Sequence, residues 1–220
     1  AIATETYQPL DENTDTDGDG TSDLFDEYPT DINKSFNNWY PSENEFGSLV
    51  FEDLWPYRGD YDFNDLVIDY RFNQITNSSN KVTELTSQVV VKAIGASYHN
   101  GFGIMLNTAA ANVNLVEGIR LTENYINLNS NGTEAGQSNA VLIYFDNANQ
   151  ILPYPGTGIG INTDPNAPYV TPDTVAVIVK LNSPVTFTDF GIPPYNPFMI
   201  INQNRGIEVH LPNTPPTQLA

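Results

Sequence analysis

The chain contains no cysteine and few basic residues, and each shortage excludes a class of protein. Without cysteine, its 220 residues can form neither a disulfide framework nor a thiolate metal site, and the redox compartment stays undecided. Only 8 Lys and Arg stand against 27 Asp and Glu, which gives a formal net charge of −19. Nucleic acid is therefore not expected as a partner, because phosphate binding requires clustered Lys and Arg.

Long apolar runs are also missing. No stretch approaches the roughly 18 consecutive apolar residues of a membrane-spanning helix, so no transmembrane segment is expected in this chain. The first ten residues, AIATETYQPL, lack the basic-then-apolar pattern of an export signal. We expect that such a signal, or a lipid anchor, either does not exist or has been removed. The hydrophobic share of 40% and the aromatic share of 11% suffice for the core of one domain.

Short segments of alternating apolar and polar residues dominate from residue 48 onward. The segments 66–72 and 174–181 place apolar side chains at every second position, which is the period of a half-buried strand. Further strands are predicted at 86–94, 140–146, 185–190, 197–202 and 206–211. The 16 prolines and 15 glycines leave little room for helices, so only a turn or two is predicted within 107–117. We predict an all-β fold, an antiparallel β-sandwich or jelly-roll-like domain.

The acidic residues are concentrated in the first third of the chain. Residues 1–69 hold 18 acidic and 2 basic residues, a net charge of −16, whereas residues 70–220 carry only −3. Such a segment repels itself unless cations neutralise it. A solvated acidic tail does not explain it, because large apolar residues run through the same stretch. We therefore expect bound cations in this part of the chain.

Residues 15–26 have the spacing of a calcium-binding loop. Counted from the first aspartate, side-chain oxygens fall at positions 1, 3, 5, 9 and 12, with glycine at position 6. Calcium takes six to eight oxygen ligands, which alternate residues of a wrapping loop can supply. An acidic flexible linker is the alternative, but it does not require so complete a spacing. The predicted ligands are the side chains of Asp15, Asp17, Asp19, Asp23 and Asp26 and the carbonyl of Thr21, with Asp11 and Asn13 placed to extend the site.

A second acidic cluster spans residues 52–65. In its second half, polar residues alternate with Tyr61 and Phe63, which puts oxygens on one side of an extended segment and rings on the other. Carboxylates held together beside an apolar strand are costly without a cation. Surface turns that carry unrelated acids are the alternative. We predict a second calcium site formed by Asp60, Asp62, Asn64 and Asp65, with help from Glu52 or Asp53.

Two resemblances add to these predictions. The pattern D-x-D-x-D-G-x-x-D-x-x-D of residues 15–26 resembles a thrombospondin type 3 calcium repeat without that family's cysteines. Together with this repeat, the segments DEYP (26–29), FEDLWP (51–56), GDYDFNDLV (59–67) and RGIEVHLP (205–212) resemble the LruC domain family. The resemblance covers nearly the whole chain. It implies a bacterial protein that is secreted or surface-anchored, often as a lipoprotein, with a β-rich domain and no established enzymatic activity.

The LruC resemblance offers no catalytic residues, and its acidic block falls on Asp60, Asp62, Asn64 and Asp65, which supports the metal hypothesis. We predict two parts: residues 1–45, an acidic calcium-repeat segment packed on the main domain, and residues 46–220, the β-sandwich. The expected function is that of a calcium-binding, non-enzymatic module on the outer cell surface or secreted, with an adhesive or scaffolding role. Its expected partners are calcium and a surface glycan or another cell-surface protein.

Two other functions stay open. The first is a carbohydrate-binding module with structural calcium, in which aromatic side chains form a platform for sugar rings. The second is a glycoside hydrolase that uses two carboxylates about 5–10 Å apart, although the sequence does not single out which ones. The candidate platform residues are Trp39, Tyr40, Trp55 and Tyr57.

Overall fold

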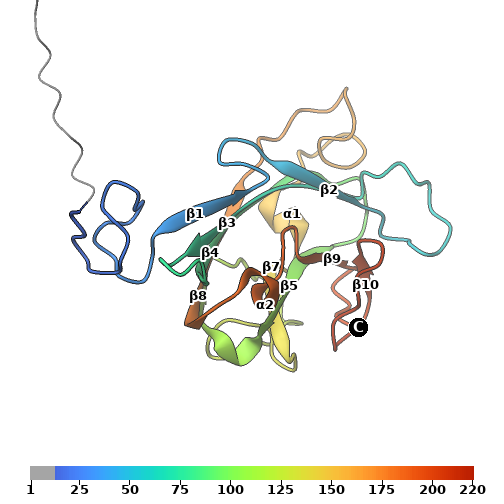
Figure 1. The fold of residues 1–220 in the computed structure, drawn as a ribbon. Helices are drawn as coiled ribbons and strands as arrows, with labels where there is room; N and C mark the ends of the chain where they lie inside the picture. Colours follow the sequence, from blue (N-terminus) through green and yellow to red (C-terminus); the bar gives the residue numbers. More distant parts are fainter. Residues whose placement is uncertain (1–12) are drawn as a thin grey trace, which may run out of the picture.

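The computed structural model describes residues 13–220, which form two antiparallel β-sheets (Figure 1). One sheet has the order β1-β3-β4-β8-β6, and β2 pairs with β3 beyond the end of β1; the other has the order β10-β9-β5-β7. The prediction of an all-β antiparallel sandwich is confirmed. The strands are β1 (Phe36–Tyr40), β2 (Gly47–Phe51), β3 (Leu66–Thr76), β4 (Val82–Ala93), β5 (Gly101–Ala109), β6 (Val113–Glu117), β7 (Asn139–Phe145), β8 (Thr174–Val185), β9 (Asn196–Ile200) and β10 (Glu208–His210).

The alternating segments bury the faces that their sequences predict. In β3, Leu66, Ile68, Tyr70 and Phe72 are at most 7% exposed, while Val67, Asp69 and Arg71 between them lie on the outer side. In β8 the buried positions are Val175, Val177 and Val179. Because each such side chain contributes about 1.5–3 kcal/mol when it leaves water, this pattern fixes the register of both strands.

The second sheet is covered on both faces. One face packs against the first sheet, where the hydroxyl of Tyr144 lies 2.7 Å from that of Ser87 across the core. The other face carries a separate apolar cluster of Val141, Ile143, Phe198 and Ile200. Side chains from the connection between β6 and β7 pack over this cluster, namely Leu121, Tyr125 and Ile126.

One strand prediction was wrong. The segment 185–190 holds the end of β8 and then the short helix α2 (Phe187–Phe190) instead of a strand. The side chain of Thr186 accepts a hydrogen bond from the N–H of Asp189 and so caps this helix, and Phe190 is buried against the core. Within 107–117, the expected helical turn is the 3₁₀ turn η1 (Ala110–Asn112), which joins β5 to β6.

The two acidic segments lie at opposite ends of β3 (Figure 1). The N-terminal loops precede β1, which pairs with the last residues of β3, and the segment 52–65 connects β2 to the first residue of β3. The division at residue 45 stays a prediction; β1, which precedes it, belongs to the first sheet, and Asp11 lies outside the described residues. With α1 (Ala148–Ile151) and α2 only 4 residues long each, no helix in the described part is long and apolar enough to cross a membrane.

Candidate metal centres

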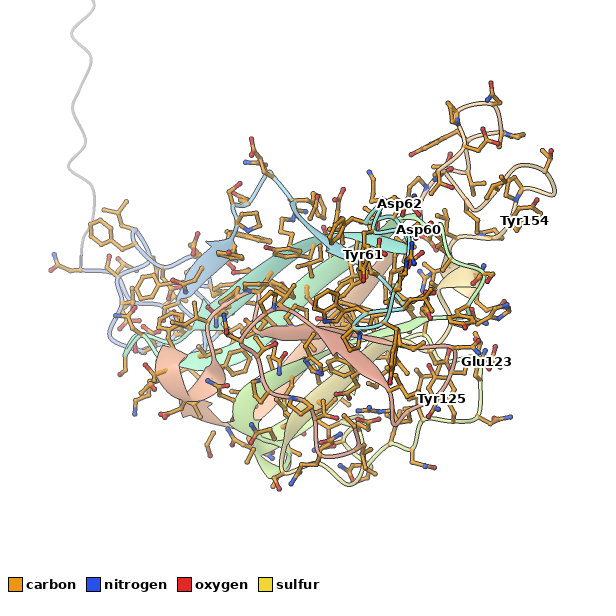
Figure 2. All side chains as sticks on the ribbon, turned by 90° about the vertical axis from the view of Figure 1, so that its right-hand side faces the viewer. Asp60, Tyr61, Asp62, Glu123, Tyr125 and Tyr154 are labelled. Carbon is orange, nitrogen blue, oxygen red and sulfur yellow. The ribbon has the colours of Figure 1, made fainter. Side chains whose placement is uncertain are left out.

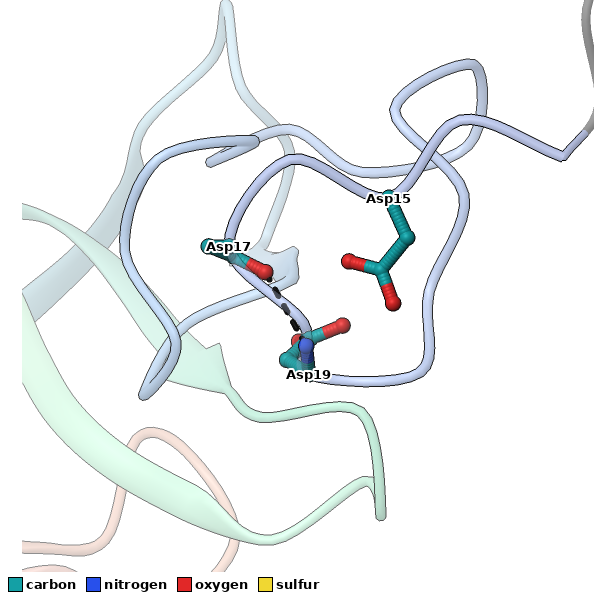
Figure 3. Close-up of side chains that lie close together, drawn as sticks. All are labelled: Asp15, Asp17 and Asp19. Carbon is teal, nitrogen blue, oxygen red and sulfur yellow. Dashed lines mark hydrogen bonds between the residues drawn. The ribbon is translucent and has the colours of Figure 1, made fainter.

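The loop that begins at residue 15 folds around its own carboxylates. Asp15 accepts hydrogen bonds from the N–H groups of Gly18 (2.8 Å) and Gly20 (3.0 Å), and both glycines have a positive φ that other residues rarely adopt. Asp17 accepts one from the N–H of Asp19 at 3.1 Å, and its other oxygen is buried with no hydrogen-bond partner among the described residues (Figure 3). Asp15, Asp17 and Asp19 each place one carboxylate oxygen within 4.8 Å of the other two. Three of the predicted ligands therefore meet in one place.

Asp26 is buried and lies close to these aspartates. Its side chain is 8% exposed, and Oδ1 accepts a hydrogen bond from the N–H of Tyr28 at 2.6 Å. Oδ2 is buried and has no hydrogen-bond partner within residues 13–220. Burial raises the pKa of Asp26, and the negative charges of Asp19, Asp17 and Asp23 raise it further. We call these five aspartates, Asp15, Asp17, Asp19, Asp23 and Asp26, the first acidic cluster.

Two predicted ligands of the first acidic cluster make hydrogen bonds within the loop. The carboxylate of Asp23 accepts hydrogen bonds from the N–H (2.8 Å) and the hydroxyl (2.6 Å) of Thr16. Thr21, predicted to supply its carbonyl, donates its N–H to Asp19 at 2.6 Å. These bonds hold the loop in its wrapped form.

Asp19 also ties the first acidic cluster to the β-sandwich. Its Oδ2 accepts a hydrogen bond from the hydroxyl of Ser35, and its carbonyl accepts one from the hydroxyl of Ser78 in the turn between β3 and β4. Burial alone would raise the pKa of Asp19, but the hydrogen bonds from Ser35 and Thr21 outweigh it and lower the pKa. The loop is thus docked on the end of the first sheet.

A second cluster forms where β2 ends. Glu52 is 4% exposed, and one of its oxygens lies within 4.8 Å of an oxygen from each of Asp60 and Asp62. Its Oε1 accepts a hydrogen bond from the N–H of Phe63, whereas its buried Oε2 has no hydrogen-bond partner in the described part of the chain. Burial raises the pKa of Glu52, and the charges of Asp65, Asp60 and Asp62 raise it further. We call Glu52, Asp60 and Asp62 the second acidic cluster.

Asp53 and Asp65 lie next to the second acidic cluster and contact each other. The N–H of Asp53 donates to Asp65 Oδ2 at 2.8 Å, and the side-chain amide of Asn100 donates to Asp53 Oδ2 at 3.1 Å. Burial raises the pKa of Asp53 to about 6; the nearby charge of Asp65 adds to this effect and the Asn100 hydrogen bond opposes it. Of the two residues predicted to help this site, Glu52 is the one that meets Asp60 and Asp62.

Asn64 is held beside the second acidic cluster by close backbone packing. Its side-chain amide donates to Asp62 at 2.5 Å, and its backbone carbonyl accepts a hydrogen bond from the N–H of Gly95 at 2.8 Å. A Cβ on Gly95 would lie 1.5 Å from Oδ1 of Asn64, so a larger residue there would force the Asn64 side chain to move.

Sequence reasoning missed the residues on the far side of this site. A hollow of about 390 Å³ is lined by Asp60, Asp62, Asn64 and Asp65 on one side and by Thr163 and Asp164 on the other (the labelled Asp60 and Asp62 are seen in Figure 2). The connection between α1 and β8 brings these last two residues there. No spacing rule links them to residues 60–65, which lie about a hundred positions earlier.

Basic side chains do not neutralise either cluster. Within residues 13–220, no ion pair joins a Lys, Arg or His to the acids of either cluster or to Asp53 and Asp65. Arg71 instead packs its guanidinium over the rings of Trp39 and Phe46 and donates to Gln88. Among residues 13–220, the carboxylates therefore gather without a compensating basic side chain.

Comparison with known proteins gives one finding. Neither the curated proteins nor the solved structures yield a match. A family model described as "Domain of unknown function (DUF4842)" matches residues 80–220, from the turn before β4 to the end of the chain. Both acidic clusters precede the matched residues. Because the match covers more than half of the chain, the protein belongs to the DUF4842 family.

Proposed function

We propose that this protein is a calcium-binding, non-enzymatic module that works outside the cell or on the outer surface of a bacterium, in an adhesive or scaffolding role. The observation that carries the proposal is the pair of buried carboxylates, Asp26 and Glu52. Each is more than nine-tenths buried, lies close enough to other carboxylates for their charges to raise its pKa, and keeps one oxygen without a hydrogen-bond partner in the described residues. Leaving such an oxygen unpaired costs about 1–3 kcal/mol, which a bound cation would offset.

The chemistry of the donors favours calcium among the metals. Both clusters offer carboxylate oxygens, and no thiolate is possible in a chain without cysteine. Hard divalent cations prefer such ligands, and calcium accepts the irregular, many-oxygen arrangement that a flexible loop supplies. The resemblance to a thrombospondin type 3 repeat supports the same ion for the first acidic cluster.

The cellular location rests on the LruC resemblance and on the affinity that such sites have. Extracellular calcium modules bind at about 10⁻⁴–10⁻³ M, so calcium saturates them only outside the cytoplasm. In this role the clustered carboxylates bind the metal ion, and none of them takes part in catalysis.

A carbohydrate-binding role is the second candidate, and two exposed rings favour it. Trp55 is 57% and Tyr57 is 79% exposed, whereas Trp39 lies against Arg71 and Tyr40 stacks on Tyr70. A glycan array, run once with calcium and once with chelator, separates the two candidates. Calcium-dependent signals on defined glycans favour carbohydrate binding, and a blank array favours a protein partner.

Calorimetry on three variants tests the metal sites themselves. Asp17→Ala combined with Asp19→Ala should abolish calcium binding at the first acidic cluster, and Glu52→Gln should abolish it at the second. Each variant should keep the binding of the other cluster. Glu117→Gln, which changes an exposed acid outside both clusters, is the matched control and should titrate like wild type. Isotherms of the cluster variants that match wild type would refute the proposal.

A further inference from the structure

A pocket lies beside the second acidic cluster, where the edges of the two sheets face each other. It has a volume of about 320 Å³. One wall comes from the end of β2 and from the segment 52–65, and the other from β10 and the residues after it. The side chains that matter here are Phe51, Trp55, Tyr61 and Phe63 on one wall and Val209 and Leu211 on the other.

Two polar side chains on these walls, His210 and Tyr61, are already hydrogen-bonded within the protein. Both ring nitrogens of His210 lie within hydrogen-bond distance of a partner, Asn196 at 2.8 Å and Glu208 at 2.7 Å. The hydroxyl of Tyr61 donates to the carbonyl of Tyr57 at 3.1 Å. The pocket therefore offers rings and hydrocarbon to an occupant and leaves few hydrogen bonds to be made. A sugar, whose hydroxyls need partners, fits it poorly, and an apolar ring fits it well.

Alternate residues of the segment 52–65 contribute to the second acidic cluster and to the pocket. Asp60 and Asp62 belong to the cluster, whereas Tyr61 and Phe63, which alternate with them, line the pocket (the labelled residues 60–62 are seen in Figure 2). Glu52 belongs to both, because its carboxylate binds the N–H of Phe63 and lies among the aspartates. An ion bound between the carboxylates would therefore fix the position of the pocket's rings.

We propose that this pocket binds an aromatic side chain of a partner polypeptide, and that calcium in the second acidic cluster holds the pocket in its binding form. The inference rests on the proposed function, since it assigns a partner and a regulatory role to that same calcium site. The volume, near the lower end for ligand pockets, suits one ring system. Trp55 and Tyr61 already pack edge to face, with ring centroids 6.5 Å apart, so the wall is prepared for a further ring.

Two observations favour a polypeptide with basic flanks as the source of that ring. β2 pairs only with β3 and β10 only with β9 among the strands of the described part, so an outer edge of each is open to an extended peptide near the pocket. The segment 52–65 carries five acidic residues and only Arg58 as a base. One calcium ion compensates part of this charge, and basic residues beside the inserted ring would compensate the rest.

Fluorescence anisotropy with two labelled peptides tests the proposal on the full chain. The first peptide has one phenylalanine between two pairs of lysines, and the second has alanine in place of the phenylalanine. In calcium, wild type should bind the phenylalanine peptide about tenfold more tightly than the alanine peptide, since burial of one ring is worth at least that factor. The preference should vanish in chelator, in Glu52→Gln and in Trp55→Ser. It should persist in Tyr154→Ser, which removes an exposed ring outside the pocket.

The outcomes separate the pocket from the metal site when calcium calorimetry accompanies each titration. If calcium binds at the second acidic cluster but wild type holds both peptides equally, the pocket inference is wrong and the calcium-binding function stands. A Trp55→Ser variant that keeps both its thermal stability and the preference also overturns the pocket. If no calcium binds, the proposed function fails, and with it the calcium control of the pocket.

Discussion

Asp26 and Glu52 show how single residues reveal a site that no strand or helix marks. Each buried carboxylate satisfies one oxygen with a backbone N–H of its own loop and leaves the other without a hydrogen-bond partner in the described residues. A core does not keep an unpaired charge when a neutral side chain of similar shape would serve. Their pKa values are raised for the same reason, since burial and like charges both disfavour the ionised form.

Gly95 provides a test at a residue that carries no charge. Gly95→Ala would place a Cβ 1.5 Å from Oδ1 of Asn64, so the asparagine must move away from Asp62. We expect calcium affinity at the second acidic cluster to fall by about tenfold, which corresponds to the loss of one well-placed oxygen ligand. Calorimetry measures this, and binding at the first acidic cluster should stay unchanged. Unaltered affinity at both clusters would show that Asn64 does not contribute.

Glu208 gives a pH prediction away from both clusters. Burial would raise its pKa, but hydrogen bonds from His210, Thr217 and Arg205 outweigh burial and lower the pKa to about 2. A carboxylate with a depressed pKa stabilises the folded state above its unfolded value, near 4.5, and this contribution is lost as pH falls toward 2. Glu208→Gln should therefore lower the free energy of unfolding by roughly 3 kcal/mol at neutral pH.

Urea unfolding at a series of pH values checks this prediction. The difference between wild type and Glu208→Gln should be largest at neutral pH and shrink between about pH 4.5 and pH 2, where wild-type Glu208 becomes protonated. Glu117→Gln, which changes an exposed acidic residue, controls for the overall effect of acidification on stability. A difference that stays constant down to pH 2 would rule out this role for the Glu208 carboxylate.

Among the elements of the fold, we expect the two acidic loops to depend most on a bound ion. They contain few buried apolar side chains, whereas the strands that flank them are packed in the core. Removal of calcium should expose 13–35 and 52–65 to protease before any strand of the sandwich, because uncompensated carboxylates then repel each other. Limited proteolysis with EDTA, followed by mass spectrometry of the fragments, locates the first cuts. First cuts within the β-strands, or the same cuts with and without calcium, would contradict the prediction.

Sequence reasoning located β3 and β8, which have one exposed and one buried face, and also β7 and β9, which are buried almost throughout, but it missed β5. β3 and β8 alternate because one face meets the core and the other lies outside it. The first half of β5 does not alternate: residues 101–104 are all buried, because the β6–β7 connection covers the outer face of the sheet there. A sheet enclosed on both sides loses the period-two pattern, so its strands are harder to find from sequence.

The candidate site was predictable to the extent that it is local in sequence. The spacing of Asp15, Asp17 and Asp19 predicted that their carboxylates lie close together, because a loop with glycines at the bends brings alternate residues inward. The partners supplied by distant elements were not foreseeable. Ser35, Gly95 and Asp164 reach the clusters only through the pairing of strands and the path of a long connection.

For the whole molecule, the uneven charge predicts how stability responds to calcium. The net charge of residues 1–69 is −16, and both acidic clusters lie within them. A ligand that binds only the folded state at about a hundred times its Kd adds roughly 2.7 kcal/mol per independent site. For a chain of this length, that corresponds to a rise in Tm of about 5–10 °C per site.

Thermal melting followed by circular dichroism, with calcium or EDTA, measures this shift. Wild type should gain from both sites, and Glu52→Gln should keep only the gain from the first acidic cluster. Magnesium at the same ionic strength controls for general screening of the acidic surface. Identical melting curves in calcium and in EDTA would mean that something other than calcium orders the N-terminal third.

β3 also connects the two acidic ends of the molecule and would carry a force applied between them. It has 11 residues, which at about 3.3 Å each span about 35 Å. At one end Ser35, beside the first acidic cluster, donates its N–H to the carbonyl of Thr76, and at the other end Leu66 follows the second acidic cluster. A force that pulls the two ends apart would act parallel to β3 and load its hydrogen bonds to β1, β2 and β4 in shear. These bonds would then resist the force together instead of breaking one by one. A chain without disulfides thus has one continuous strand that connects its two acidic ends.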